Sequence, residues 1–188
     1  LAFDFHGKMA PALAIEICHE IKGMRPLFVE EPVPQENIDA LKQVSDHVPF
    51  PIATGERLLS RWEFREVFEK QAVAFIQPDG SHAGGITECR LIAGMAEAYY
   101  TPLAPHNPQG PCSLAASLQI AACVPNFFAQ ERGDNEYEEL LAKPFPPIKD
   151  GHRPIPTEPG LGITIDEDKL QAMVGEPRPY LAQFDPDD

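Results

Sequence analysis

The chain has 188 residues, 43% of them hydrophobic, and its 29 Asp and Glu outnumber its 15 Lys and Arg to give a net charge of −14. This acidity argues against nucleic acid and anionic membranes as partners, and no apolar run reaches the length of about 18 residues that a membrane-spanning helix needs. We expect a soluble, cytoplasmic protein with a sizeable core, whose four widely spaced cysteines are reduced and mostly buried.

Six short apolar runs recur along the chain, and each leads into an acid or a histidine. The runs are LAFDF, LFVEEP, FPIATGE, AFIQPD, TPLAPH and FFAQE, and their polar ends are Asp4, Glu30, Glu56, Asp79, His106 and Glu131. Successive polar ends lie 23 to 27 residues apart. Such a regular spacing is typical of strands that alternate with helices.

Helical spacing of apolar residues fills the intervals between these runs. The predicted apolar stripes are Leu13, Ile17 and Ile21; Ile38, Leu41 and Val44; and Ile92, Met95 and Ala96. Ser60 and Glu63 in SRWE form a capping box that predicts the start of a further helix. A strand, turn and helix unit repeated in this way predicts an α/β fold with a parallel sheet.

The arrangement of polar strand ends favours a (β/α)8 barrel over a doubly wound sheet, because every barrel strand delivers its carboxyl end to one mouth. Only six of eight units are present, so we interpret residues 1–140 as units three to eight of a partial TIM barrel that begins at an interior strand. Residues 141–188 are predicted to form a proline-rich wrap with a short helix near Asp166–Val174.

Three acids at successive strand ends, Asp4, Glu30 and Glu56, predict a site for a hard cation, most simply Mg²⁺. Glu31 should point the other way along its strand, and Asp39 should lie on a helix. We therefore interpret both of these acids as structural.

His106 lies at a strand end flanked by prolines, and Asp79, one strand earlier, is its expected orienting partner; together they would form a base. His6 lies two residues beyond Asp4, so an extended strand would put both side chains on one face, where His6 could act as an acid. Glu131 could hydrogen-bond a substrate carboxylate or orient a cationic group. His82 is a weaker candidate, for which a structural role is favoured.

The ordered set DFHG, FVEEP, ATGER, IQPDGSHAGGITE, APHNPQGP and AQE closely resembles the enolase superfamily, in its mandelate racemase/muconate lactonizing enzyme subgroup. Within that subgroup it looks most like the D-galactonate dehydratases and related acid-sugar dehydratases, from residue 1 to about residue 175. The resemblance implies the C-terminal barrel part of such an enzyme, with the N-terminal capping domain absent from this chain.

The resemblance also implies roles for the site residues. Asp4, Glu30 and Glu56 match the Mg²⁺ ligands. The remaining roles are His106 as general base, Asp79 as its dyad partner, His6 as the acid for the departing 3-hydroxyl, and Glu131 near the substrate carboxylate, so that Glu131, His6 and His106 would contact substrate.

These roles imply a Mg²⁺-dependent dehydratase that removes the C2 proton of an aldonate, with D-galactonate the best single substrate, and eliminates the 3-hydroxyl to give a 2-keto-3-deoxy acid. The alternatives are a mannonate, gluconate or aldarate dehydratase, a racemase, or a non-catalytic barrel fragment. We expect the full-length protein to bind a small acid sugar and to form a homo-oligomer.

Overall fold

The computed structural model describes residues 1–133 and 137–174. Its strands are β1 (Phe3–Asp4), β2 (Val29–Glu30), β3 (Ile52–Thr54) and β4 (Phe75–Ile76), and they form a parallel sheet in the order β1-β2-β3-β4. Parallel bridges from Ile76 to Leu103 and from Leu103 to Phe127 continue the sheet. All six predicted runs therefore lie side by side in chain order.

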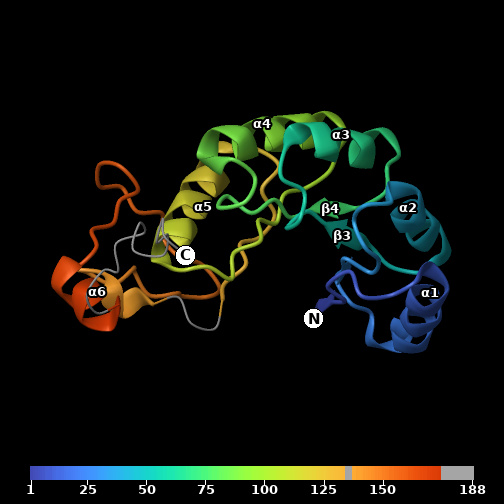
Figure 1. The fold of residues 1–188 in the computed structure, drawn as a ribbon, viewed down its shortest axis with the longest axis horizontal. Coiled ribbons are helices and arrows are strands. Elements are labelled where there is room, and N and C mark those ends of the chain that lie inside the picture. The colour runs from blue at the N-terminus through green and yellow to red at the C-terminus, as the bar shows by residue number, and fades with distance from the viewer. Residues whose placement is uncertain (134–136, 175–188) are drawn as a thin grey trace, which may run out of the picture.

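Helices alternate with these strands and lie along one side of them (Figure 1). They are α1 (Pro11–Glu20), α2 (Ile38–His47), α3 (Arg61–Glu69), α4 (Gly85–Ala98) and α5 (Pro111–Cys123), with a 3₁₀ turn, η1 (Ile21–Met24), after α1. α1 packs on α2, α3 on α4, and α4 on α5. The α/β fold class and the partial barrel of about six units are thus confirmed.

Local sequence signals set several helix ends. Before α3, the backbone N–H of Ser60 donates to Glu63 Oε2 at 2.9 Å, and both hydrogen bonds of the capping box form. Before α2, the side chain of Asn37 accepts from the Ala40 N–H at 3.1 Å. Each cap pairs backbone donors that a helix leaves unsatisfied at its first turn.

The predicted apolar stripe is confirmed on α2 and wrong on α1. Ile38, Leu41 and Val44 are all buried, whereas α1 buries Ala14 and Cys18 and leaves Leu13 49% exposed. α1 is the first helix of the row in Figure 1, and its neighbouring helix is α2. Its small Ala14 and Cys18 face the core, Ile15 and Ile21 pack partly buried against it, and Leu13 lies on the exposed flank.

The C-terminal segment packs against α5 and forms a second hydrophobic cluster. Its members include Leu114 and Leu118 of α5 together with Leu141 and Phe145. The segment contains η2 (Glu138–Leu140), an antiparallel bridge between Leu141 and Ile165, and α6 (Glu167–Val174). The predicted short helix is confirmed, and the part of the predicted wrap over 175–188 lies outside the described residues.

All four cysteines are free, but only two of them are buried, so the expectation that they are mostly buried is wrong. Cys18 and Cys89 are buried and free, whereas Cys112 and Cys123 are free and exposed. Burial raises the pKa of Cys18 to about 11 and that of Cys89 to about 12, so both are inert thiols at neutral pH.

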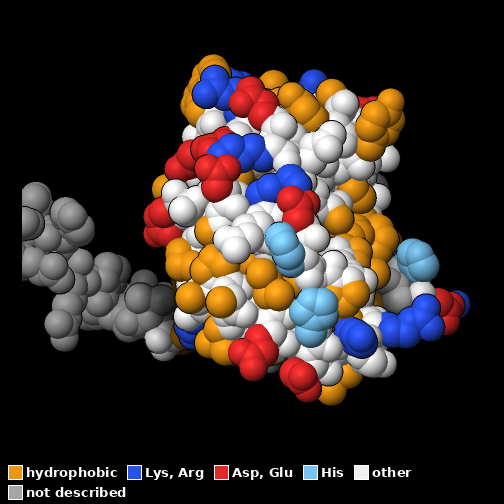
Figure 2. All heavy atoms as spheres, turned by 90° about the vertical axis from the view of Figure 1, so that its right-hand side faces the viewer, with side chains coloured by type: hydrophobic (Ala, Val, Ile, Leu, Met, Phe, Trp, Pro, Cys, Tyr) orange, Lys and Arg blue, Asp and Glu red, His pale blue; other side chains and the backbone are white. Residues whose placement is uncertain are grey.

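The face that carries α1 and α2 shows hydrophobic side chains in several places among acidic and basic ones (Figure 2). Exposed apolar residues from this end of the chain include Leu1, Leu13, Met24 and Leu27. β1 is also the edge strand of the sheet. An uncovered sheet edge with apolar neighbours is a surface to which further structure can pack. In the described part of the chain, no helix is long and apolar enough to cross a membrane.

Gly55 is expected to be indispensable for packing of β3 on β4. Its φ is +154°, and a Cβ there would lie 2.5 Å from the backbone carbonyl carbon of Gln77. We predict that Gly55→Ala lowers the free energy of unfolding by about 3 kcal/mol, measured by urea denaturation.

Gly94→Ala is the matched control, because Gly94 lies within α4 and its added Cβ would meet nothing within 4 Å. It is expected to raise stability by up to about 1 kcal/mol. Equal effects of the two substitutions would contradict the close approach at Gly55.

Candidate active site

The predicted site residues follow the carboxyl ends of the strands. Asp4 and Glu30 end β1 and β2 and are paired in the parallel register, and Glu56 lies two residues after β3. Parallel strands bring these ends to one edge of the sheet. A cavity of about 340 Å³ opens there, and its lining includes Asp4, Glu30, Gln77 and Glu131.

The buried imidazole of His106 lies between two carboxylates. Its Nδ1 is 2.8 Å from Asp79 Oδ2, and its Nε2 is 2.5 Å from Glu56 Oε2. Since an ionised carboxylate only accepts, two such contacts need a proton on each ring nitrogen. If both carboxylates are ionised, the ring would be an imidazolium that donates to Asp79 and to Glu56.

The pKa values of the pair agree with that geometry. Burial opposes protonation of His106, but the hydrogen bond to Asp79 and the charges of Glu131 and Glu56 outweigh it and raise the pKa of the ring above its ordinary value. Burial would raise the pKa of the Asp79 carboxyl, yet the hydrogen bonds from His106 and from the Ser81 N–H hold it below its ordinary range.

Glu30 is a buried acid among other acids. Its carboxylate accepts a hydrogen bond from Gln77 Nε2 at 2.7 Å. Burial, followed by the negative charges of Asp4, Glu131 and Glu56, raises its pKa to about 7 against the opposing effect of Gln77. This concentration of negative charge is what a bound cation would relieve.

His6 lies beside Asp4 as predicted, but a turn and not an extended strand places it there. β1 ends at Asp4, and His6 has a left-handed backbone with φ 51°, so the extended-strand argument is wrong here. The turn is closed by the His6 N–H, which donates to Asp4 Oδ1 at 2.6 Å. It brings His6 Nδ1 to 3.3 Å from Asp4 Oδ2 and 3.1 Å from Glu56 Oε1.

Glu31 belongs to the same cluster, which the alternation along its strand did not predict. It is fully buried, its φ is 41°, and its Oε2 accepts a hydrogen bond from Arg57. Burial raises the pKa of its carboxyl despite the opposing effect of Arg57. Among the described residues, the three whose ligand atoms lie within 4.8 Å of one another are His6, Glu31 and Glu56. Asp4 and Glu30 fall outside that group, although both lie on the same rim.

His82, the weaker candidate, lies at the mouth of the site. Its Nδ1 is 3.1 Å from the carbonyl oxygen of Glu56, and its Nε2 is 3.3 Å from Gln109 Nε2. Its ring centroid lies 6.3 Å from that of His106. A ring with its proton on Nδ1 would donate to the Glu56 carbonyl and accept from the Gln109 amide, and these contacts tie the loop after β4 to Glu56. These contacts agree with the predicted structural role.

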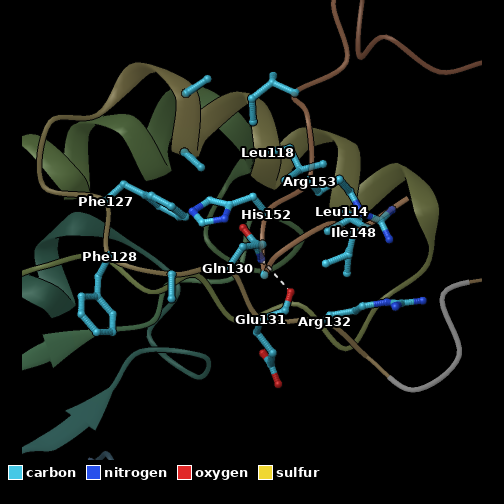
Figure 3. Close-up of a pocket in the computed structure, with 15 residues that line it drawn as sticks. Leu114, Leu118, Phe127, Phe128, Gln130, Glu131, Arg132, Ile148, His152 and Arg153 are labelled. Atoms are coloured by element: carbon cyan, nitrogen blue, oxygen red, sulfur yellow. Dashed lines mark hydrogen bonds between the residues drawn. The ribbon is translucent and has the colours of Figure 1, made fainter. Parts of the chain in front are cut away.

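Glu131 anchors the loop of the proposed base. Its Oε2 accepts from the backbone N–H of Asn107 at 2.6 Å, next to His106. Figure 3 shows its side chain turned away from that of Gln130, which accepts a hydrogen bond from Ser117 of α5 at 2.8 Å. The cavity drawn there, of about 490 Å³, lies between α5 and residues 148–155. It is larger than the cavity at the strand ends but contains none of the other predicted site residues.

Comparison with known proteins decides the family. The model of the family described as "Enolase C-terminal domain-like" matches residues 1–169. The chain belongs to the enolase superfamily. Among solved structures, this enolase-superfamily chain is similar to a protein from Burkholderia SAR-1 described as a mandelate racemase/muconate lactonizing enzyme, with 39% identity over 92% of this chain and a TM-score of 0.85.

Two further structures are of proteins described as dehydratases. The one from Mesorhizobium loti has 36% identity over 92% of the chain with a TM-score of 0.86. The one from Salmonella enterica serovar Typhimurium has 34% identity over 90% of the chain, also with a TM-score of 0.86. The chain spans only 43%, 47% and 43% of the Burkholderia, Mesorhizobium and Salmonella chains.

The buried charge of Glu30 gives a pH-dependent stability that can be measured without any ligand. Its ordinary pKa is 4.5 and its folded-state pKa is about 7, so ionisation is disfavoured in the folded state and stability is lost as the pH rises from 4.5 through 7. We predict that, at pH values above 7, the free energy of unfolding of Glu30→Gln exceeds that of wild type by about 3 kcal/mol, because the variant has no buried charge at this position.

The measurement is the free energy of unfolding of wild type and variant in EDTA across this pH range. The difference between the two should grow with pH. Glu97→Gln, which alters an exposed acid of α4, is the control, and a pH-independent difference for Glu30→Gln would contradict the interpretation.

Proposed function

We propose that the protein carrying this chain is a Mg²⁺-dependent acid-sugar dehydratase. The observation that carries the proposal is the position of His106, held at Nδ1 by Asp79 and directed through Nε2 at the carboxylate rim. His6 reaches the same Glu56 carboxylate at its other oxygen. A base and an acid beside a cation site are the groups that elimination of water from a hydroxy acid requires.

The donor set fits magnesium. Asp4, Glu30 and Glu56 offer only carboxylate oxygens, which Mg²⁺ prefers to nitrogen or sulfur. Gln77 Oε1 is buried without a hydrogen-bond partner among the described residues, and the neighbouring Glu30 has a raised pKa. When bound, the cation would stabilise negative charge developing on the substrate carboxylate and offset the charge of Glu56.

His106 would act as the general base. After losing the proton that it shares with Glu56, its Nε2 would accept the C2 proton of the substrate. Asp79 would keep the other proton on Nδ1 and stabilise the resulting imidazolium. Glu131 would hold the loop that carries the base through the Asn107 N–H.

His6 would act as the general acid. Its side chain is 51% exposed, so a substrate can reach it. As C2 loses its proton and the C3–O bond breaks, His6 would donate a proton to the departing hydroxyl, which leaves as water. The resulting enol tautomerises to a 2-keto-3-deoxy acid. The net change is loss of one water molecule, because His106 takes one proton and His6 supplies another.

The substrate class follows from the need for a carboxylate with hydroxyls at C2 and C3, which aldonates and aldarates share. We propose D-galactonate as the first candidate. The dehydratase descriptions of the Mesorhizobium and Salmonella relatives support elimination as the reaction.

We predict that the protein carrying this chain converts at least one six-carbon acid sugar to a 2-keto-3-deoxy acid in the presence of Mg²⁺ and loses this activity in EDTA. The measurement is product formation over a panel of galactonate, gluconate, mannonate and aldarates. Absence of turnover on every member would overturn the dehydratase assignment, and exchange or epimerisation at C2 without elimination would indicate a racemase instead.

Substitution of His106 and of His6 should affect two different steps, removal of the C2 proton and elimination of the 3-hydroxyl. His106→Asn is expected to lower exchange of the C2 proton with solvent deuterium by at least about a hundredfold. His6→Asn should retain exchange and lose elimination. Both rates can be followed by proton NMR, with His47→Asn on the exposed end of α2 as the control. Undiminished exchange in His106→Asn would refute its role as the base.

A further inference from the structure

We propose that Gln130 is a positioning residue for the base, and that it holds the peptide group on the amino side of His106. Its Nε2 donates to the carbonyl oxygen of Pro105 at 3.3 Å and to that of Glu131 at 3.0 Å. The second of these bonds is the dashed line in Figure 3. The side chain thus binds the main chain at two places, one of them directly before the histidine.

The orientation of the Gln130 amide follows from its neighbours. Backbone carbonyl oxygens can only accept, so both of them require the NH2 group of the amide. The amide oxygen faces α5, where the buried hydroxyl of Ser117 donates to Oε1 at 2.8 Å. Both N–H donors and the acceptor are therefore engaged, and the bonds join α5 to the loop that carries the base.

A side chain is needed at this point because the backbone ladder of the sheet cannot continue. The Leu103 N–H donates to the Asn126 carbonyl and the Phe128 N–H donates to the Leu103 carbonyl, each at 2.8 Å. The next bond of a parallel ladder would use the N–H of residue 105, but Pro105 has none. The Gln130 amide binds the Pro105 carbonyl just beyond the point at which the ladder stops.

Two consecutive side chains hold the peptide groups on both sides of His106. The first, Gln130, binds the Pro105 carbonyl, which belongs to the peptide before the histidine. The second, Glu131, accepts at Oε2 from the Asn107 N–H at 2.6 Å, which belongs to the peptide after it. Because each peptide group is planar, holding both planes restricts φ and ψ of the histidine and the direction of its Cα–Cβ bond.

Loss of this hold should slow proton removal and leave substrate affinity nearly unchanged. Asp79 fixes the ring of His106 through Nδ1, but that bond does not fix the main chain from which the ring projects. A displaced base is a weaker catalyst, since proton transfer requires the reacting atoms to be aligned to within about 1 Å. This consequence rests on the proposed function, whereas the hold on the main chain does not.

Hydrogen exchange of the substrate-free protein carrying this chain tests the hold directly. Gln130→Met keeps the length of the side chain and removes its hydrogen bonds. We expect the Asn107 amide to exchange at least about fivefold faster in this variant than in wild type, while the amides of α2 are unchanged. The measurement is mass spectrometry of the peptide that contains Asn107, in which the neighbouring prolines have no amide hydrogen and few other amides contribute.

Gln119→Met is the matched control. Gln119 is half-buried like Gln130, and its Nε2 also donates to a proline carbonyl, that of Pro156 at 2.9 Å. It lies on α5 and makes this bond to the C-terminal segment instead of the loop of the base. The variant should leave exchange of the Asn107 amide as in wild type.

Turnover supplies the second measurement. In Gln130→Met, exchange of the C2 proton with solvent deuterium should fall about tenfold at saturating substrate, with KM within about twofold of the wild-type value. Ser117→Ala removes one hydroxyl from the network and should change both exchange rates in the same direction by a smaller factor. It tests the proposal even if Gln130→Met does not fold.

Wild-type exchange of the Asn107 amide in both Gln130→Met and Ser117→Ala would overturn the role of Gln130. Equal acceleration of the α2 amides would also overturn it, because a general loss of stability would then explain the effect. The amide measurement uses no substrate, so failure of the dehydratase proposal and failure of this one are distinguishable.

Discussion

The carboxylate of Glu56 lies between two imidazoles, with Oε1 3.1 Å from His6 Nδ1 and Oε2 2.5 Å from His106 Nε2. The rest of the site is arranged around this contact. Glu56 can occupy this position because the preceding Gly55 lets β3 approach the backbone at Gln77 more closely than any side chain would permit. The close approach of the backbone at Gly55 thus helps to set the position at which Glu56 contacts His6 and His106.

The negative charge around Glu56 has an energetic cost that the fold must sustain. Glu30 is buried beside other acids, and its raised pKa records the unfavourable free energy of keeping it ionised. Active sites commonly retain such destabilising arrangements because the charges serve binding or catalysis. The large core beneath α2, α3 and α4, with fully buried residues such as Leu41, Phe64 and Ile92, supplies the compensating stability.

Much of the architecture could be predicted from the sequence, because it depends on repetition. The six apolar runs, their spacing and the capping box before α3 depend only on local pattern, and the structure has them. The contact between Asp79 and His106 was also predictable, since consecutive parallel strands place their ends side by side.

The details of the cluster near His6 depend on features that local pattern does not encode. Alternation along a strand assumes an extended backbone, but His6 and Glu31 both have left-handed backbones, with φ 51° and 41°. The turn at His6 keeps it beside Asp4 through the hydrogen bond from the His6 N–H to Asp4 Oδ1. The turn at Glu31 accompanies burial of its side chain against Arg57. Likewise, the face of α1 that is buried depends on its place at the end of the helix row, which its own sequence does not reveal.

Helix α5 belongs to two hydrophobic clusters at once. Ile120 contributes to the main core, whereas Leu114 and Leu118 pack with the C-terminal segment around Leu141. The helix begins at Pro111, shortly after the loop of His106. Local opening of the C-terminal segment would therefore uncover the face of α5 that carries Leu114 and Leu118, while Ile120 would stay packed in the main core.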